Sequence, residues 1–171
     1  MPITRRTLLK SGLTLGALGA LGAVGVGYNE VSKIDSKAKI VIVGGGAGGI
    51  GIANMLLRKL NGAQITVIEP RDFHWYQPGQ TLLLAGSYDS KSDVVAPLNR
   101  YVDRQINWKR GSVVEFQPDM NIVITESGEK VGYDYLIVST GIELRYDLIE
   151  GMDTGLIGKG GIASIYHSPE A

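Results

Sequence analysis

The sequence predicts an α/β fold in which a parallel sheet carries an antiparallel β-meander. The apolar run 39–43 breaks into a glycine-rich turn, and a helical pattern and a second apolar run at 64–68 follow, which is typical of a βαβ unit. Beyond residue 105 the chain changes to short runs separated by turn residues, which indicates a meander. Together these patterns favour one α/β domain.

The turn reads Gly44-x-Gly46-x-x-Gly49 and is the most informative motif of the chain. Gly44 permits the tight turn, Gly46 lets the backbone approach a phosphate, and Gly49 lets the helix lie close to the strand. The first free N–H groups of that helix would face an anion. We therefore predict that this segment holds a pyrophosphate, with the residues Gly44, Gly46, Ala47, Gly48 and Gly49.

The residues after this turn complete a dinucleotide-binding fingerprint. Asn61-Gly62 is a helix stop, and the strand at 64–68 ends in Glu69, 20 residues past Gly49, where a ribose-binding acid is expected. The apolar face of the helix consists of Ile50, Ala53, Leu57 and Leu60. The alternative is that the glycines only form a turn between a core strand and a core helix, and that Glu69 is solvated at a strand end.

Residues 70–93 have little periodicity, and we expect a long loop at the carboxyl edge of the sheet, where ligands bind in such folds. Four adjacent aromatic side chains there could flank a planar ring or merely cover the sheet edge: Phe73, His74, Trp75 and Tyr76. His74 alone is no evidence of catalysis, because no partner acid or metal ligand can be assigned to it.

A short helix is expected at 97–101, followed by a parallel strand, a meander and another buried strand. The strand predictions are 106–109, 112–116, 121–125 and 133–139. The last strand runs into Thr140-Gly141. Close approach of the backbone to a ligand would explain Gly141, and a plain turn glycine is the alternative.

Composition excludes some functions. The 171 residues have no net charge, but residues 1–27 hold three basic residues and no acid, which leaves 14 basic and 17 acidic residues in the body. This argues against nucleic acid as a partner. A small basic group is interpreted as a solvated face: Arg100, Arg104, Lys109 and Arg110. Without cysteine the chain has no disulfide or cysteine metal site, and no metal site is predicted.

Residues 1–27 are predicted to be a targeting segment, with a basic start and an apolar, glycine-rich run. The stretch from Thr4 to Lys10 resembles a twin-arginine export signal, although Leu8 stands where that signal more often has Phe. An ordinary secretory signal or a short membrane anchor is the alternative. The expected location is the periplasm or the extracytoplasmic face of the membrane. A linker at 28–37, a nucleotide-binding domain at 38–150 and a connecting segment at 151–171 would follow.

From about Lys37 onward the chain resembles the flavoprotein disulfide reductase superfamily, whose members bind FAD and have two dinucleotide-binding domains. The resemblance rests on the glycine motif with Glu69, on Ser139-Thr140-Gly141, and on the meander with Gly111-Ser-Val113. Within the superfamily, the stretches 74–82 and 141–151 look like sulfide:quinone oxidoreductases, and the latter also looks like the flavoprotein subunit of flavocytochrome c sulfide dehydrogenase.

The resemblance implies a Rossmann-like FAD-binding domain with the meander as an insertion, incomplete at its carboxyl end. It implies that the glycine motif holds the FAD pyrophosphate and that Glu69 holds the adenosine ribose. Val113 would meet the adenine through its backbone, Thr140 and Gly141 would pass close to the cofactor, and the loop at 77–81 would approach the isoalloxazine.

The resemblance also implies an activity. Sulfide would be taken up by a cysteine disulfide, and its electrons would pass through FAD to quinone, or to cytochrome c in the flavocytochrome. Members continue past the position of Ala171 with a second dinucleotide-binding domain that carries the redox cysteines and with a returning segment that completes the FAD site. They end in a carboxyl-terminal part that holds quinone or docks the partner and could bring peripheral membrane association. We therefore expect an amino-terminal fragment that is inactive alone, and no catalytic residue can be named. A type II NADH dehydrogenase is disfavoured by the export leader, and a non-catalytic FAD-binding remnant remains open.

Overall fold

The computed structural model describes residues 33–167. The chain divides into two units, Met1–Ile34 and Asp35–Ala171, and the fold below is that of the second. The predicted targeting segment lies outside the described residues, as do the first five residues of the predicted linker and the last four residues of the connecting segment.

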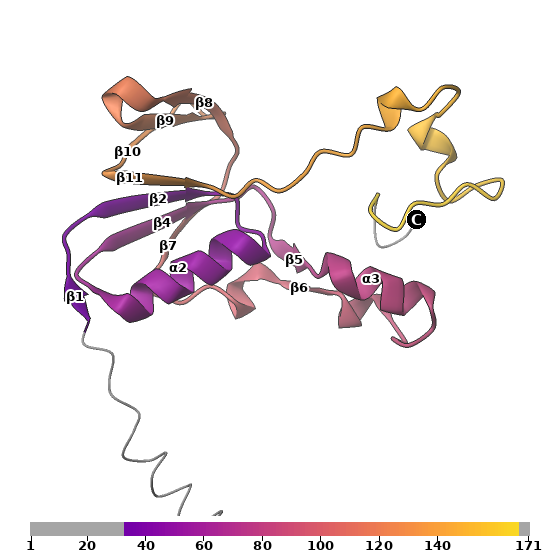
Figure 1. Ribbon diagram of the computed structural model, residues 1–171, viewed down its shortest axis with the longest axis horizontal. Helices are drawn as coiled ribbons and strands as arrows, with labels where there is room; N and C mark the ends of the chain where they lie inside the picture. The colour runs from indigo at the N-terminus through magenta and orange to yellow at the C-terminus, as the bar shows by residue number, and fades with distance from the viewer. Residues whose placement is uncertain (1–32, 168–171) are drawn as a thin grey trace, which may run out of the picture. The chain divides into compact units, whose positions relative to one another are not determined.

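Four parallel strands form the central sheet, in the order β11-β2-β4-β7 (Figure 1). They are β2 (Lys39–Val43), β4 (Gln64–Ile68), β7 (Asn107–Lys109) and β11 (Tyr135–Val138). β2 pairs with β4 and β11 along its length, in register with no bulge. The parallel sheet predicted from the apolar runs is confirmed, and the strands at 39–43 and 64–68 have the predicted bounds.

Both faces of the sheet are covered, which explains why β2 is an unbroken apolar run. Helix α2 (Ala47–Lys59) lies against one face, where Ile40 and Ile42 pack with Ala53. On the other face Val41 and Val43 pack with Val123 and Val131 of the meander. Because successive side chains of a strand point to opposite faces, each β-branched residue of β2 enters one of two cores.

The meander consists of three antiparallel strands, in the order β10-β9-β8. They are β8 (Val113–Gln117), β9 (Ile122–Thr125) and β10 (Lys130–Gly132). β8 and β9 are joined by a 3-10 turn, η3 (Pro118–Met120), and by Asn121, whose φ is +52°. The predicted meander is confirmed, although its three-residue third strand was not predicted.

Residues 70–93 were predicted to form a long loop, but much of this segment is helix and strand, so that prediction was wrong. β5 (Phe73–Trp75) pairs antiparallel with β6 (Val95–Pro97), and helix α3 (Gln77–Leu84) lies between them in the chain. Pro78 stands in the first turn of α3, where a missing N–H costs no hydrogen bond. Two 3-10 turns flank β6: η1 (Lys91–Asp93) and η2 (Leu98–Arg100), the latter within the helix predicted at 97–101.

The remaining elements are short. β1 (Ile34–Asp35), within the predicted linker, and β3 (Leu60–Asn61) form a two-stranded sheet, and α2 ends just before β3. Two further 3-10 turns are η4 (Tyr146–Leu148) and η5 (Thr154–Leu156). Between residues 33 and 167, none of the helices has the length and apolar character needed to cross a membrane.

Candidate dinucleotide-binding site

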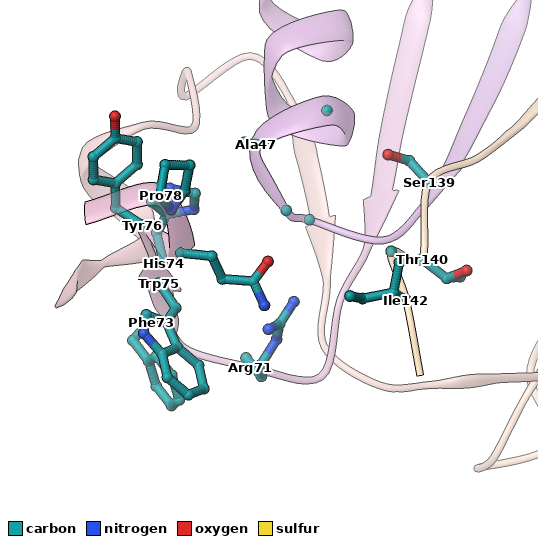
Figure 2. Close-up of a pocket in the computed structure, with 15 residues that line it drawn as sticks. Ala47, Arg71, Phe73, His74, Trp75, Tyr76, Pro78, Ser139, Thr140 and Ile142 are labelled. Atoms are coloured by element: carbon teal, nitrogen blue, oxygen red, sulfur yellow. The ribbon is translucent and has the colours of Figure 1, made fainter. Parts of the chain in front are cut away.

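The strand order reverses at β2, which places a crevice at the carboxyl ends of the strands. The chain passes from β2 to β4 and β7 on one side, whereas β11 returns to the other side of β2. In open α/β sheets ligands bind at such a switch point. Gly44 follows β2 and the run 139–141 follows β11, so the two motifs singled out in the sequence lie next to each other here. Figure 2 shows Ser139 and Thr140 beside the turn that leads into α2.

The turn after β2 can be made only by glycine. Gly44 has a φ of +102°, and a Cβ at this position would lie 2.2 Å from the Ser139 carbonyl oxygen. Its N–H donates to the Ile68 carbonyl at 2.9 Å, which joins the turn to the end of β4. A Cβ at Gly49 would lie 1.9 Å from the Gly44 carbonyl oxygen. The backbone of α2 therefore approaches the strand end more closely than any side chain would permit.

The N-terminus of α2 is open toward the crevice. Gly46 is the N-cap residue, no side chain caps the helix, and its first turn carries no acid. A Cβ at Gly46 would meet nothing within 4 Å. Because the first N–H groups of a helix lack intrahelical acceptors and carry the positive end of its dipole, this terminus offers an anion both hydrogen bonds and favourable charge.

Glu69 is buried at the end of β4, with only 3% of its surface exposed, so it is not the solvated residue of the alternative interpretation. Its carboxylate accepts hydrogen bonds from the Gly45 N–H at 2.7 Å and the Arg71 N–H at 3.0 Å. The Arg71 guanidinium adds two more, at 2.7 Å from Nε and 3.3 Å from Nη2. Burial alone would raise the pKa of Glu69, but the hydrogen bonds from Arg71 and Gly45 and the charge of Arg71 together hold it below its ordinary value.

Two cavities meet at this point. The first, which we call the aromatic cavity, has a volume of about 330 Å³ and is lined by Gly45–Gly48, Arg71, residues 73–78 and residues 139–142 (Figure 2). The second, the strand-end cavity, has about 290 Å³ and is lined by residues 43–44, 68–71, 111–113 and Thr140. Arg71 and Thr140 line both. A ligand with two bulky ends and a narrow middle could therefore occupy both cavities.

The four adjacent aromatic residues, 73–76, all line the aromatic cavity, which favours the ring-flanking interpretation over simple cover of the sheet edge. The His74 ring packs edge-on against Tyr101, with 5.1 Å between ring centroids. Burial and the nearby charge of Arg71 lower the pKa of His74, which favours its neutral form. The buried indole N–H of Trp75 has no hydrogen-bond partner among the described residues.

The other predicted residues lie on the same two cavities. Val113 and Thr140 line the strand-end cavity, on which Glu69 also lies. Gly141 lines the aromatic cavity with a φ of +84°, a conformation that a turn would also require, so its role stays a prediction.

The sequence interpretation missed Arg71, although an arginine two residues past a predicted ribose acid was a usable signal. The described part of the chain contains no cluster of His, Asp and Glu residues suited to a metal ion.

Comparison with known proteins agrees with this arrangement. The family model described as "Pyridine nucleotide-disulphide oxidoreductase" matches residues 38–166. The mitochondrial sulfide:quinone oxidoreductase of Dictyostelium discoideum is 41% identical over 138 residues, which is 80% of this chain and 30% of that protein. The mouse mitochondrial sulfide:quinone oxidoreductase is 35% identical over 117 residues, 68% of this chain and 26% of that protein.

The solved sulfide:quinone oxidoreductase from Aquifex aeolicus has a TM-score of 0.51 to this chain and 31% identity, over 63% of this chain and 25% of that one. The chain thus spans about a third or less of the length of these relatives.

The family and these relatives are FAD-binding flavoproteins. The residues present fit this cofactor. An uncapped helix N-terminus with an unobstructed glycine suits a pyrophosphate, and a buried carboxylate lies beside the strand-end cavity, as a ribose diol requires. A match over residues 38–166, three quarters of the sequence, shows that the chain belongs to the pyridine nucleotide-disulphide oxidoreductase family.

Proposed function

We propose that this chain forms the FAD-binding part of an oxidoreductase that oxidises sulfide and passes the electrons to quinone. The observation that carries the proposal is the pair of cavities that meet between the N-terminus of α2 and Arg71, with Glu69 beside one and four aromatic residues beside the other. The sulfide and quinone assignments rest on the relatives, whose names state both.

The residues of this chain bind and orient the cofactor in this proposal. The N–H groups at Gly46, Ala47 and Gly48 would hold the pyrophosphate, and Glu69 would accept hydrogen bonds from the adenosine ribose. The strand-end cavity at Val113 would take the adenine, and the aromatic cavity would take the isoalloxazine. Bound FAD supplies two-electron redox chemistry. The glycine turn is joined to the end of β4 by the bond from the Gly44 N–H to the Ile68 carbonyl, so we expect the donors to be aligned before the cofactor binds.

Binding of FAD is the first test. The purified 171-residue chain is mixed with FAD, passed over a desalting column, and examined by absorption spectroscopy. We expect the flavin spectrum to co-elute with the protein, and FMN, which lacks the adenosine half, to be retained much less. A chain that is folded by circular dichroism but elutes without flavin contradicts the proposal that these residues by themselves form a FAD site.

The second test concerns the electron acceptor. Since the 171 residues contain no cysteine, we expect no sulfide-dependent quinone reduction by this chain alone. The coding sequence is therefore read past Ala171, and any longer protein is assayed with sulfide and either a soluble quinone or cytochrome c. Quinone reduction supports the proposal. Reduction of cytochrome c alone supports the flavocytochrome alternative, and a stop codon after Ala171 supports the non-catalytic remnant.

Export is the third part of the proposal, and it is supported by Arg5 and Arg6 in the leader. Residues 1–37 are fused to a folded reporter protein, which is then located by cell fractionation. We expect the reporter in the periplasm, and we expect Arg5→Lys with Arg6→Lys to retain it in the cytoplasm. Export that survives the double substitution contradicts a twin-arginine route and favours an ordinary secretory signal.

A further inference from the structure

The Glu69 carboxylate has no free acceptor position left in this structure. A carboxylate offers about four lone-pair sites. Four N–H donors of the chain already occupy the two oxygens, one from Gly45 and three from Arg71. A ribose diol needs two of these sites. Since the backbone donors are fixed by the turn and the strand end, the two bonds from the Arg71 side chain are those that can be exchanged.

Arg71 is placed to make another bond if it leaves Glu69. Its side chain is 46% exposed and lines both cavities. Figure 2 shows it in the aromatic cavity. It shares the aromatic cavity with Gly45–Gly48, at the N-terminus of α2. A guanidinium pairs strongly with phosphate oxygens and can do so through two parallel hydrogen bonds.

We propose that Arg71 selects pyrophosphate-linked dinucleotides by exchanging partners, from the Glu69 carboxylate in the free protein to the ligand's pyrophosphate in the complex. This inference rests on the proposed FAD site and deepens it. A ligand that carries both a ribose diol and a pyrophosphate replaces the bonds that it breaks. A nucleoside without phosphates breaks the Arg71–Glu69 pair and offers the guanidinium nothing in return.

The exchange predicts opposite effects on two ligands. Arg71→Gln should weaken FAD binding by roughly 10-fold to 100-fold, the range of a lost hydrogen bond to a charged group. The same substitution should leave adenosine binding unchanged or make it tighter, because Glu69 is no longer occupied by the guanidinium. A residue with a merely structural role would weaken both ligands together.

The experiment measures FAD and adenosine binding by isothermal titration calorimetry. The proteins are the 171-residue chain, Arg71→Gln, Arg71→Lys and a control, Arg145→Gln. Arg145 forms a similar pair with a carboxylate two residues away, Asp147, and lines neither cavity. Arg71→Lys keeps the charge without the two-bond geometry, so we expect FAD affinity between those of the wild type and Arg71→Gln. The salt dependence of FAD binding should be shallower in Arg71→Gln, because one cation facing the pyrophosphate is lost.

The outcomes separate the two proposals. Suppose that the wild type binds FAD. If Arg71→Gln binds FAD equally well, or if its affinities for FAD and adenosine fall by the same factor, partner exchange is wrong and the FAD site stands. If the wild type binds neither ligand, the FAD site is wrong and the exchange falls with it. If Arg71→Gln does not fold, the same comparison is made with Arg71→Lys, where equal losses for the two ligands overturn the inference.

Discussion

Gly44 lies so close to Ser139 that a methyl group on Gly44 would come within 2.2 Å of the Ser139 carbonyl oxygen. These residues follow β2 and β11, the two strands between which the strand order reverses. The ends of the two strands are also joined by a hydrogen bond from the Ser139 N–H to the Val43 carbonyl at 2.7 Å. The backbone segments that follow β2 and β11 are therefore in direct contact at the site, with no side chain between them.

Gly44→Ala should destabilise the fold. The substitution forces a positive φ on a residue with a Cβ and drives that Cβ against a backbone carbonyl, neither of which a rotamer change can relieve. We expect the free energy of unfolding to fall by roughly 3 kcal/mol or more. Urea denaturation followed by circular dichroism measures this. A loss below about 1 kcal/mol would mean that the turn relaxes easily, contrary to its contacts on both sides.

Gly46→Ala should separate binding from folding. Gly46 has a φ of −71°, and an added Cβ would meet nothing within 4 Å, so we expect the free energy of unfolding to stay within about 1 kcal/mol of the wild type. The methyl group would instead occupy the space through which a pyrophosphate approaches the helix. FAD affinity should fall by about tenfold or more, equivalent to about 1.4 kcal/mol. Unchanged FAD affinity in a folded variant would contradict the pyrophosphate assignment.

Much of this arrangement was predictable because it is local in sequence. The bounds of β2 and β4 follow from short runs rich in Ile and Val that end at Gly44 and Glu69, and the turn between β2 and α2 follows from glycine spacing. β5 was not predictable in the same way, since its three residues are ordered by pairing with β6, about twenty residues away. α3 is only eight residues long, which is too short to show a clear helical period in the sequence. The hydrogen bonds of Arg71 depend on the direction in which its side chain points, and this direction cannot be predicted from the spacing of residues in the sequence.

Acid should weaken the fold through Glu69. Its pKa in the folded protein lies below that of an unfolded glutamate, about 4.3. The stability that its ionised form contributes is therefore fully present above this value and is lost as the pH falls through the lower folded pKa. Glu69→Gln should lower the free energy of unfolding at pH 7 by about 1–3 kcal/mol and flatten its decline in acid. Urea denaturation from pH 7 to pH 3 tests this, with Asp147→Asn as the control, because Asp147 has a lowered pKa but is exposed. Parallel pH curves for wild type and Glu69→Gln would assign the acid sensitivity to other groups.

The two tryptophans of the chain can decide whether the aromatic cavity receives the isoalloxazine. Trp75 lines that cavity, whereas Trp108 is in β7 beneath the Arg110 guanidinium and lines neither cavity at the site. An indole in contact with an isoalloxazine quenches the fluorescence of the isoalloxazine by electron transfer. The rate of this transfer falls steeply with distance. We expect Trp75→Phe to raise the emission of protein-bound FAD several-fold and Trp108→Phe to leave it unchanged. Each variant retains one tryptophan, so the pair is matched in composition. An increase only in Trp108→Phe would place the isoalloxazine away from residues 73–76 and return those aromatic side chains to the role of covering the sheet edge.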